Sequence, residues 1–122
     1  DVYKRQISHN IQNIALDNGA LNNERENDKI DKKRVWWVEA ESVVGFINAY
    51  QHSGEKKFLE SARSVWEYIK AEMIDKREGS EWYAEVSYDH KPHDWKEIVG
   101  PWKCPYHNGR MCMEVINRGV DF

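Results

Sequence analysis

The fold is decided by residues 36–54, which read WWVEAESVVGFINAYQHSG. Apolar side chains recur in this stretch at helical spacing along two rows: Trp37, Ala40, Val44 and Ile47, and Trp36, Val43, Phe46 and Tyr50. The final His52-Ser53-Gly54 supplies a helix stop. A helix that is apolar on so much of its circumference is predicted to be buried inside a larger body.

A second helix is predicted directly after this stop, because apolar residues again recur on one face: Phe58, Leu59, Ala62, Val65, Trp66, Ile69 and Met73. Two helices joined by so short a turn must be antiparallel neighbours. Weaker helical patterns occupy residues 7–15 and 107–118. Residues 22–33 predict a loop, and 81–86 predict a strand in a small β-hairpin. The predicted fold class is therefore all-α with a small β-hairpin between helices.

Composition excludes several classes of protein. Charged residues make up 32% of the chain but the net charge is only -3, so nucleic-acid binding is not expected. The chain shows neither an apolar run of membrane-spanning length nor a signal peptide, which predicts a cytoplasmic protein. The only two cysteines, Cys104 and Cys112, are expected to be free thiols, and no His or Cys spacing indicates a metal site.

The chain is expected to be part of a longer protein. It opens at Asp1, and residues 1–6 show no pattern connected with the helical pattern that begins at Ile7, so they are interpreted as a non-native end. The mostly apolar helix at 36–51 needs partners on both sides, and the remaining elements are too few to supply them. Residues 7–122 are therefore interpreted as the C-terminal part of a single larger domain.

The first candidate site lies at the start of the helix at residue 36. Trp36 and Trp37 point in directions about 100° apart, so one can face a cleft while the other packs. An indole ring offers a flat apolar surface to the C–H face of a sugar. Glu41 shares a face with Trp37 and could accept sugar hydroxyls or orient a basic group. The alternative is that both tryptophans are core and that Glu39 and Glu41 are solvated or are partners of the helix dipole at its N-terminus.

The second candidate site is the loop at residues 100–108, which reads GPWKCPYHN. Two prolines stiffen it, and it leads into a helix that begins near His107. Rigidity suits a catalytic side chain, and histidine can act as acid or base near neutral pH. The alternative is a helix-start histidine satisfied by backbone groups. Lys103 and Arg110 could contact hydroxyls but would ordinarily be solvated.

The two sites together resemble the cellobiose 2-epimerases. The resemblance rests on Trp36 to Glu41, on the Val43-Val44-Gly45-Phe46 that comes next, and on Gly100 to Asn108, which is the most specific motif. The paired tryptophans are shared more broadly with N-acylglucosamine 2-epimerases and related sugar isomerases. Glu39 stands where many relatives have Gln.

This resemblance implies part of an (α/α)6 barrel and a cofactor-free reaction. One histidine removes the C2 proton from the opened reducing-end glucose of a disaccharide, and a second histidine returns a proton to the other face of the enediolate. The resemblance implies that His107 is one of these bases, that Trp37 and Trp102 stack on the sugar and that Trp36 lines the same wall. The partner histidine and an arginine lie upstream in relatives, so the isolated chain is expected to be inactive.

Other functions remain open at this point. On the same scaffold, the chain could belong to an N-acylglucosamine 2-epimerase or to an aldose–ketose isomerase. A different class is a non-catalytic carbohydrate-binding module that uses the tryptophans alone. The partner expected on the epimerase reading is a disaccharide substrate, with no nucleic acid and no membrane, and the complete protein is expected to be a monomer.

Overall fold

The computed structural model describes residues 2–121, with side chains from Gln6 onward. Its elements follow in this order: α1 (Val2–Asn10), η1 (Ile11–Ala15), β1 (Leu16–Asp17), β2 (Ala20–Leu21), β3 (Glu24–Glu26), β4 (Lys29–Asp31), β5 (Arg34–Val35), α2 (Trp36–Ser53), α3 (Lys56–Tyr68), η2 (Ile69–Met73), β6 (Glu85–Val86) and α4 (Tyr106–Arg118). The predicted predominance of helix is confirmed. None of the helices within residues 2–121 has the length and apolar character needed to cross a bilayer.

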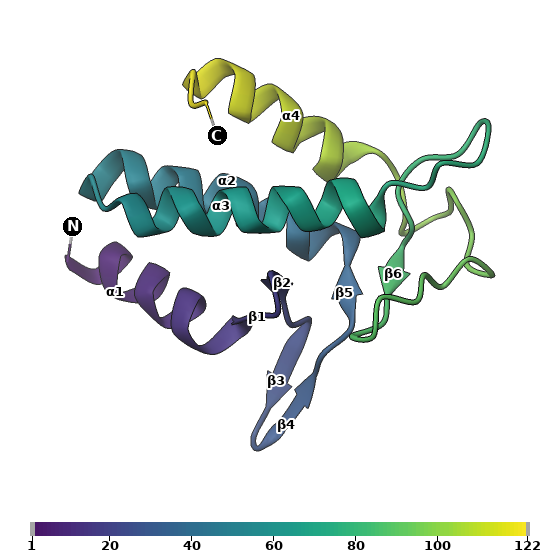
Figure 1. The fold of residues 1–122 in the computed structure, drawn as a ribbon, viewed down its shortest axis with the longest axis horizontal. Helices are drawn as coiled ribbons and strands as arrows, with labels where there is room; N and C mark the ends of the chain where they lie inside the picture. The colour runs from purple at the N-terminus through teal and green to yellow at the C-terminus, as the bar shows by residue number, and fades with distance from the viewer. Residues whose placement is uncertain (1, 122) are drawn as a thin grey trace.

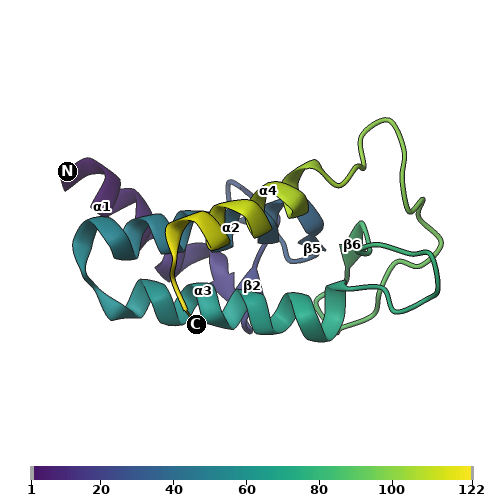
Figure 2. The same cartoon turned by 90° about the horizontal axis from the view of Figure 1, so that it is seen from above.

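The helical hairpin α2–α3 forms the centre of the structure, and its two helices run side by side in both views (Figures 1 and 2). Gly54 ends α2 in the left-handed conformation, at φ 72°, and its N–H donates to the Tyr50 carbonyl at 2.7 Å. Only glycine adopts this conformation without strain, so the predicted helix stop is confirmed. The turn leaves α3 antiparallel to α2, and η2 continues α3 as a π-helical segment.

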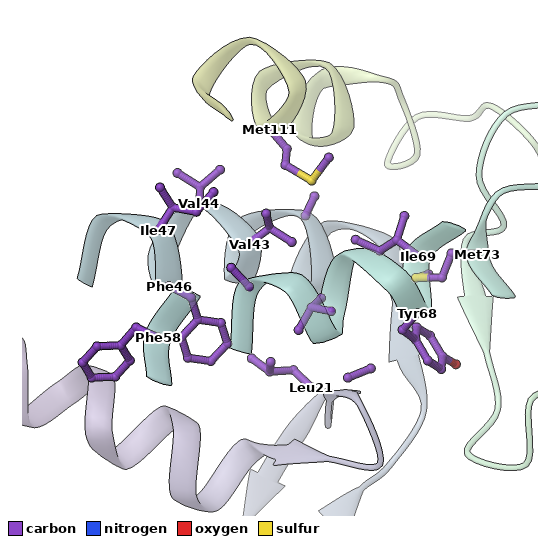
Figure 3. Packing of buried hydrophobic residues seen from close by; sticks show 14 of the residues in the cluster. Leu21, Val43, Val44, Phe46, Ile47, Phe58, Tyr68, Ile69, Met73 and Met111 are labelled. Carbon is purple, nitrogen blue, oxygen red and sulfur yellow. The ribbon is translucent and has the colours of Figure 1, made fainter. Parts of the chain in front are cut away.

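The core is built around α2, which lies between α1 on one side and α4 on the other (Figure 1). In the close view, Phe46 of α2 lies beside Phe58 of α3, and Met111 reaches from α4 toward Val43 and Val44 (Figure 3). Val43 and Phe58 are fully buried. The α2 helix is thus largely buried, and the expectation that this chain has too few elements to supply its partners is wrong, because α1, α3 and α4 pack around it. The packing of α4 over α2 positions the candidate site.

The prediction of a loop over residues 22–33 is wrong in part, because β3 and β4 form an antiparallel hairpin there. Asn27 adopts φ 53° at the tip, which a tight two-residue hairpin turn requires. The three residues of β3, Glu24 to Glu26, are all exposed. An exposed hairpin has no alternation of buried and solvated side chains, so its sequence carries no strand signal.

The predicted strand at residues 81–86 forms, but over a shorter span and with a distant partner. Its last two residues make β6, which pairs with β5, and a single bridge joins Val86 to Pro92 across the next turn. Strand propensity is visible in a local stretch of sequence, whereas pairing with residues much earlier in the chain is not. This pairing brings the end of β5, and hence the start of α2, beside the segment that leads to α4.

The first helix begins at Val2, five residues before the predicted start at Ile7. Residues 2–6 therefore continue into α1, while Asp1 lies outside the described residues. The interpretation of residues 1–6 as a non-native end stays a prediction.

A buried polar pair fastens the β1–β2 turn to the start of α2. Arg34, at 1% exposure, donates to the carbonyls of Asp17 and Ala20 and to the side chain of Asn22. Glu39 is fully buried and accepts the Leu21 N–H at 3.0 Å. The alternative that Glu39 is solvated is therefore wrong, although it does lie in the first turn of α2. Burial raises the pKa of Glu39 to about 8, because its second oxygen has no partner among the described residues.

Replacing Glu39 with Gln should stabilise the protein, and the gain should grow with pH. The folded state holds the Glu39 proton more tightly than the unfolded state, so native stability falls as pH rises from about 4.5 to about 8. Glutamine keeps an oxygen for the Leu21 N–H and does not titrate. Urea unfolding should show near-equal stability at pH 4 and an advantage for Glu39→Gln on the order of a few kcal/mol at pH 8. A pH-independent difference would contradict this account.

Candidate active site

The site begins with Trp37 and Glu41, which lie one turn apart on α2. Trp37 is 43% exposed, and the Glu41 side chain is 34% exposed, so neither belongs to the core. Their spacing of four residues places both on one helix face, as the sequence predicts. The same face carries an apolar groove of about 450 Å³, whose walls include Ile7 of α1, Ile11 of η1 and Phe46 of α2. The alternative that Trp37 is a core residue is wrong.

His107 meets these two residues from α4. Its Nδ1 atom lies 2.9 Å from Glu41 Oε1, and its ring centroid lies 5.9 Å from that of Trp37. The residues are far apart in sequence, and the packing of α4 over α2 brings them together. The alternative that His107 is satisfied only by backbone groups is wrong, because a carboxylate holds its ring.

The contact with Glu41 determines which ring nitrogen of His107 is free. An ionised carboxylate only accepts hydrogen bonds, so Nδ1 must carry the proton that lies between the two groups. In the neutral ring, Nε2 then keeps its lone pair. The arrangement produces a base at Nε2 and a carboxylate positioned to stabilise the imidazolium that forms when Nε2 takes a proton.

Arg110 completes the arrangement one turn further along α4. Its guanidinium donates to Glu41 Oε2 at 2.6 Å, so each oxygen of the Glu41 carboxylate has a partner on α4. Two bonds fix the plane of the carboxylate and hence the orientation of the His107 ring. From the sequence, Arg110 is expected only to be solvated or to contact a hydroxyl. The signal that could have identified it is its position three residues after His107, on the same helix face.

The two remaining predicted residues occupy different environments. Trp102 is 90% exposed and lies in the loop before α4, five residues ahead of His107. Trp36 is half-buried and packs against the core, with the Lys103 ammonium 5.6 Å from the ring centre. The structure thus brings Trp37 and His107 into contact, leaves Trp102 open to solvent, and turns Trp36 toward the protein interior.

Three of the other histidines, His9, His90 and His93, take part in other contacts. His9 of α1 packs on Phe58 and lies 3.5 Å from Glu55, while His93 pairs with Glu85 in the segment before α4. Residues 2–121 contain no grouping of three or more His, Cys, Asp or Glu side chains placed to hold a metal ion. The chemistry that the described residues offer is proton transfer at His107 beside an exposed aromatic surface.

An oriented imidazole beside an indole ring on a helical scaffold defines a site suited to proton transfer, and known proteins carry the same fold. A family model described as N-acylglucosamine 2-epimerase (GlcNAc 2-epimerase) matches residues 6–109. A curated cellobiose 2-epimerase from Ruminococcus albus is 78% identical over 116 residues, which cover 95% of this chain and 30% of that protein.

Two solved structures extend the comparison. A sugar epimerase from a ruminal bacterium superposes with a TM-score of 0.94 at 76% identity. The match covers 97% of this chain and 30% of the chain of that epimerase. The cellobiose 2-epimerase of Bacillus thermoamylovorans superposes with a TM-score of 0.89 at 50% identity. The match covers 93% of this chain and 29% of that protein. The chain belongs to the N-acylglucosamine 2-epimerase family. It spans about 30% of the length of these relatives, and its helices form part of their (α/α)6 barrel fold.

Substituting Glu41 should disturb the site far more than the stability of the fold. The side chains of Glu41, His107 and Arg110 are each about one-third exposed, so water screens both pairs. Glu41→Gln should lower the free energy of unfolding by about 1 kcal/mol or less, as measured by urea denaturation. A loss of several kcal/mol would show instead that the pairs are part of the structural core.

Proposed function

We propose that this chain is the C-terminal part of a single (α/α)6-barrel epimerase that inverts C2 of the reducing-end glucose of cellobiose and related β-1,4-disaccharides. The observation that carries the proposal is the bond between His107 Nδ1 and Glu41, which leaves Nε2 free beside Trp37. The relatives named as cellobiose 2-epimerases support the choice of substrate. The product is a glucosyl-mannose.

The reaction begins with the open-chain aldehyde of the reducing-end glucose. Nε2 of His107 takes the proton from C2, the C–H electron pair forms the C1–C2 double bond of an enediolate, and the negative charge moves to the C1 oxygen. Glu41 stabilises the imidazolium that results, and Arg110 keeps the Glu41 carboxylate in place. No oxidant or reductant is needed, so the reaction requires no redox cofactor.

Inversion requires a second acid–base group that donates a proton to the opposite face of the enediolate, because one group cannot serve both faces. The contacts of His9 and His93 place these residues away from His107, on α1 and beside β6. On this proposal, the second base comes from the part of the longer protein that this chain does not include. Trp37 and Trp102 supply aromatic surfaces on which the sugar rings stack, and the part of Trp36 that is not packed against the core lines the same wall. The complete protein acts as a cytoplasmic monomer on this proposal.

The reaction is tested in a chimera in which this chain replaces the matching segment of the Ruminococcus albus enzyme. We expect cellobiose in heavy water to give glucosyl-mannose with deuterium at C2, followed by NMR. Conversion of N-acetylglucosamine or mannose with cellobiose untouched would mean that the substrate is wrong, and would favour an N-acylglucosamine 2-epimerase or an aldose–ketose isomerase.

Within this chimera, His107→Gln should lower kcat by about 100-fold or more, the usual contribution of a positioned base. The matched control is His93→Gln, because His93 also bonds through Nδ1 to a glutamate, Glu85, at 3.0 Å. That variant should keep the parent rate of C2 deuterium exchange. Equal losses in the two variants would contradict a specific role for His107.

Stacking on Trp102 is tested by its alanine variant. Trp102→Ala should raise the KM for cellobiose roughly tenfold, because an aromatic surface worth about 1–1.5 kcal/mol is lost. Trp95 is also highly exposed and lies in the same segment, so Trp95→Ala is the control and should leave KM within about twofold of the parent. A Trp102→Ala variant with unchanged KM would remove Trp102 from the binding site.

The isolated chain should bind sugar weakly and show no epimerisation, because it lacks the second base. Incubation of the purified chain with cellobiose should therefore give no glucosyl-mannose, followed by NMR at the reducing end. A carbohydrate-binding module predicts sugar affinity that is retained in His107→Gln and an inactive chimera. Epimerisation by the isolated chain would contradict the proposal.

A further inference from the structure

The segment between β6 and α4, residues 87–105, has no helix or strand, yet it carries Trp102 and leads directly to His107. Most of its side chains from Asp94 to Pro105 are exposed. A segment of this kind does not hold a catalytic group in place by apolar packing, so specific polar contacts must fix its course.

Lys103 is the buried exception in this segment. The residue is 3% exposed, whereas Trp102 and Cys104 on either side are exposed. Its ammonium group donates to the Glu81 carboxylate and to the Ile98 carbonyl at 3.0 Å. The Gly100 N–H donates to the Lys103 carbonyl at 2.8 Å, which closes the turn that presents Trp102. A buried lysine is stable only where its charge is paired, so these contacts fix the turn.

The same glutamate also holds the first turn of α4. Asn108 is 7% exposed, and its amide donates to the other oxygen of the Glu81 carboxylate. Asn108 is the residue directly after His107. One carboxylate, presented by the segment between η2 and β6, therefore bonds to residues on both sides of the catalytic candidate.

We propose that Glu81 is a positioning residue that acts through Lys103 and Asn108 to set the place of His107 and Trp102. These three residues, Glu81, Lys103 and Asn108, are called the Glu81 clamp. The proposal rests on the proposed function of His107 as a base. Glu41 orients the imidazole ring, and the Glu81 clamp fixes the backbone from which that ring projects.

The clamp works through charge as well as shape. Without the Glu81 charge, Lys103 would be a buried cation with only a carbonyl and the Trp36 ring for partners. The opening of residues 100–105 would release the ammonium to water and lower this free-energy cost. Such an opening moves both Trp102 and the start of α4. If the charge of Lys103 is removed at the same time, residues 100–105 have no buried cation to release and can stay closed. A neutral pair can then fill the same space, with the amide oxygen of a glutamine at position 81 still accepting from Asn108.

The test uses the same chimera with Glu81→Gln and the double variant Glu81→Gln/Lys103→Met. Glu85→Gln is the matched control, because the Glu85 carboxylate also bonds a lysine, Lys96, and a second side chain, His93, and neither of these partners lies on α4. The readouts are kcat for C2 deuterium exchange and the NMR signal of the His107 Nδ1 proton that is bonded to Glu41.

Glu81→Gln should lower kcat at least tenfold and shift or broaden the His107 ring signal. The double variant should recover kcat to within about threefold of the parent and restore the signal. Glu85→Gln should change neither. If Glu81→Gln alone does not fold, the double variant tests the proposal. A folded double variant with the His107 signal of the parent chimera supports the Glu81 clamp.

The proposal is overturned if Glu81→Gln keeps the parent kcat and ring signal, or if the double variant is no better than the single variant. Failure of the double variant to fold also overturns it. If the parent chimera does not act on cellobiose, the proposed function fails, while the ring signal still decides whether Glu81 positions His107.

Discussion

The packing of α4 across α2 is the constraint on which the site depends. It brings His107 and Arg110 onto the two oxygens of Glu41, which lies on a different helix. A carboxylate bonded at both oxygens cannot rotate. Glu41 therefore holds the imidazole ring of His107 in a fixed orientation relative to the two packed helices. Met111 anchors the same α4 turn in the core and keeps this geometry from depending on surface pairs alone.

The start of α2 contains two glutamates with opposite roles. Glu39 is fully buried, holds the β1–β2 turn through Leu21, and has a raised pKa. Glu41, two residues later, points away from the core and holds the site. Residues two apart on a helix do not share a face, so one stretch of sequence supplies both a structural carboxyl and a functional carboxylate. Glutamine at position 39 would preserve the structural bond, which agrees with the amide that resemblance suggests for relatives.

The sequence predicts the parts of this structure that depend on local periodicity. The helices at 36–51 and 58–73, and their antiparallel turn at Gly54, follow from apolar spacing and a helix stop. The β3–β4 hairpin was not predicted because most of its residues are charged and exposed, and the pairing of β6 with β5 was not predicted because β5 lies far from β6 in the sequence. Local patterns do not encode which distant strand is adjacent.

The same limit applies to the site. Trp37, Trp102 and His107 could be proposed from residue chemistry and motif resemblance, but their environments could not. The pairing of Glu41 with Arg110 and the burial of Lys103 against Glu81 both arise from contacts between segments far apart in the chain. Charged residues are ordinarily solvated, so a sequence does not distinguish the few that are paired in the protein interior from the others. Only the packed structure distinguishes them.

The central claim is that Glu41 holds the proton of His107 at Nδ1 and leaves Nε2 as the base. The most direct test is a two-dimensional ¹H–¹⁵N spectrum of the His107 ring in the folded protein, recorded at a pH at which the ring is neutral. The account predicts the Nδ1–H tautomer, with loss of that preference in Glu41→Gln. A ring protonated at Nε2, or one that exchanges freely between the two tautomers, would contradict it.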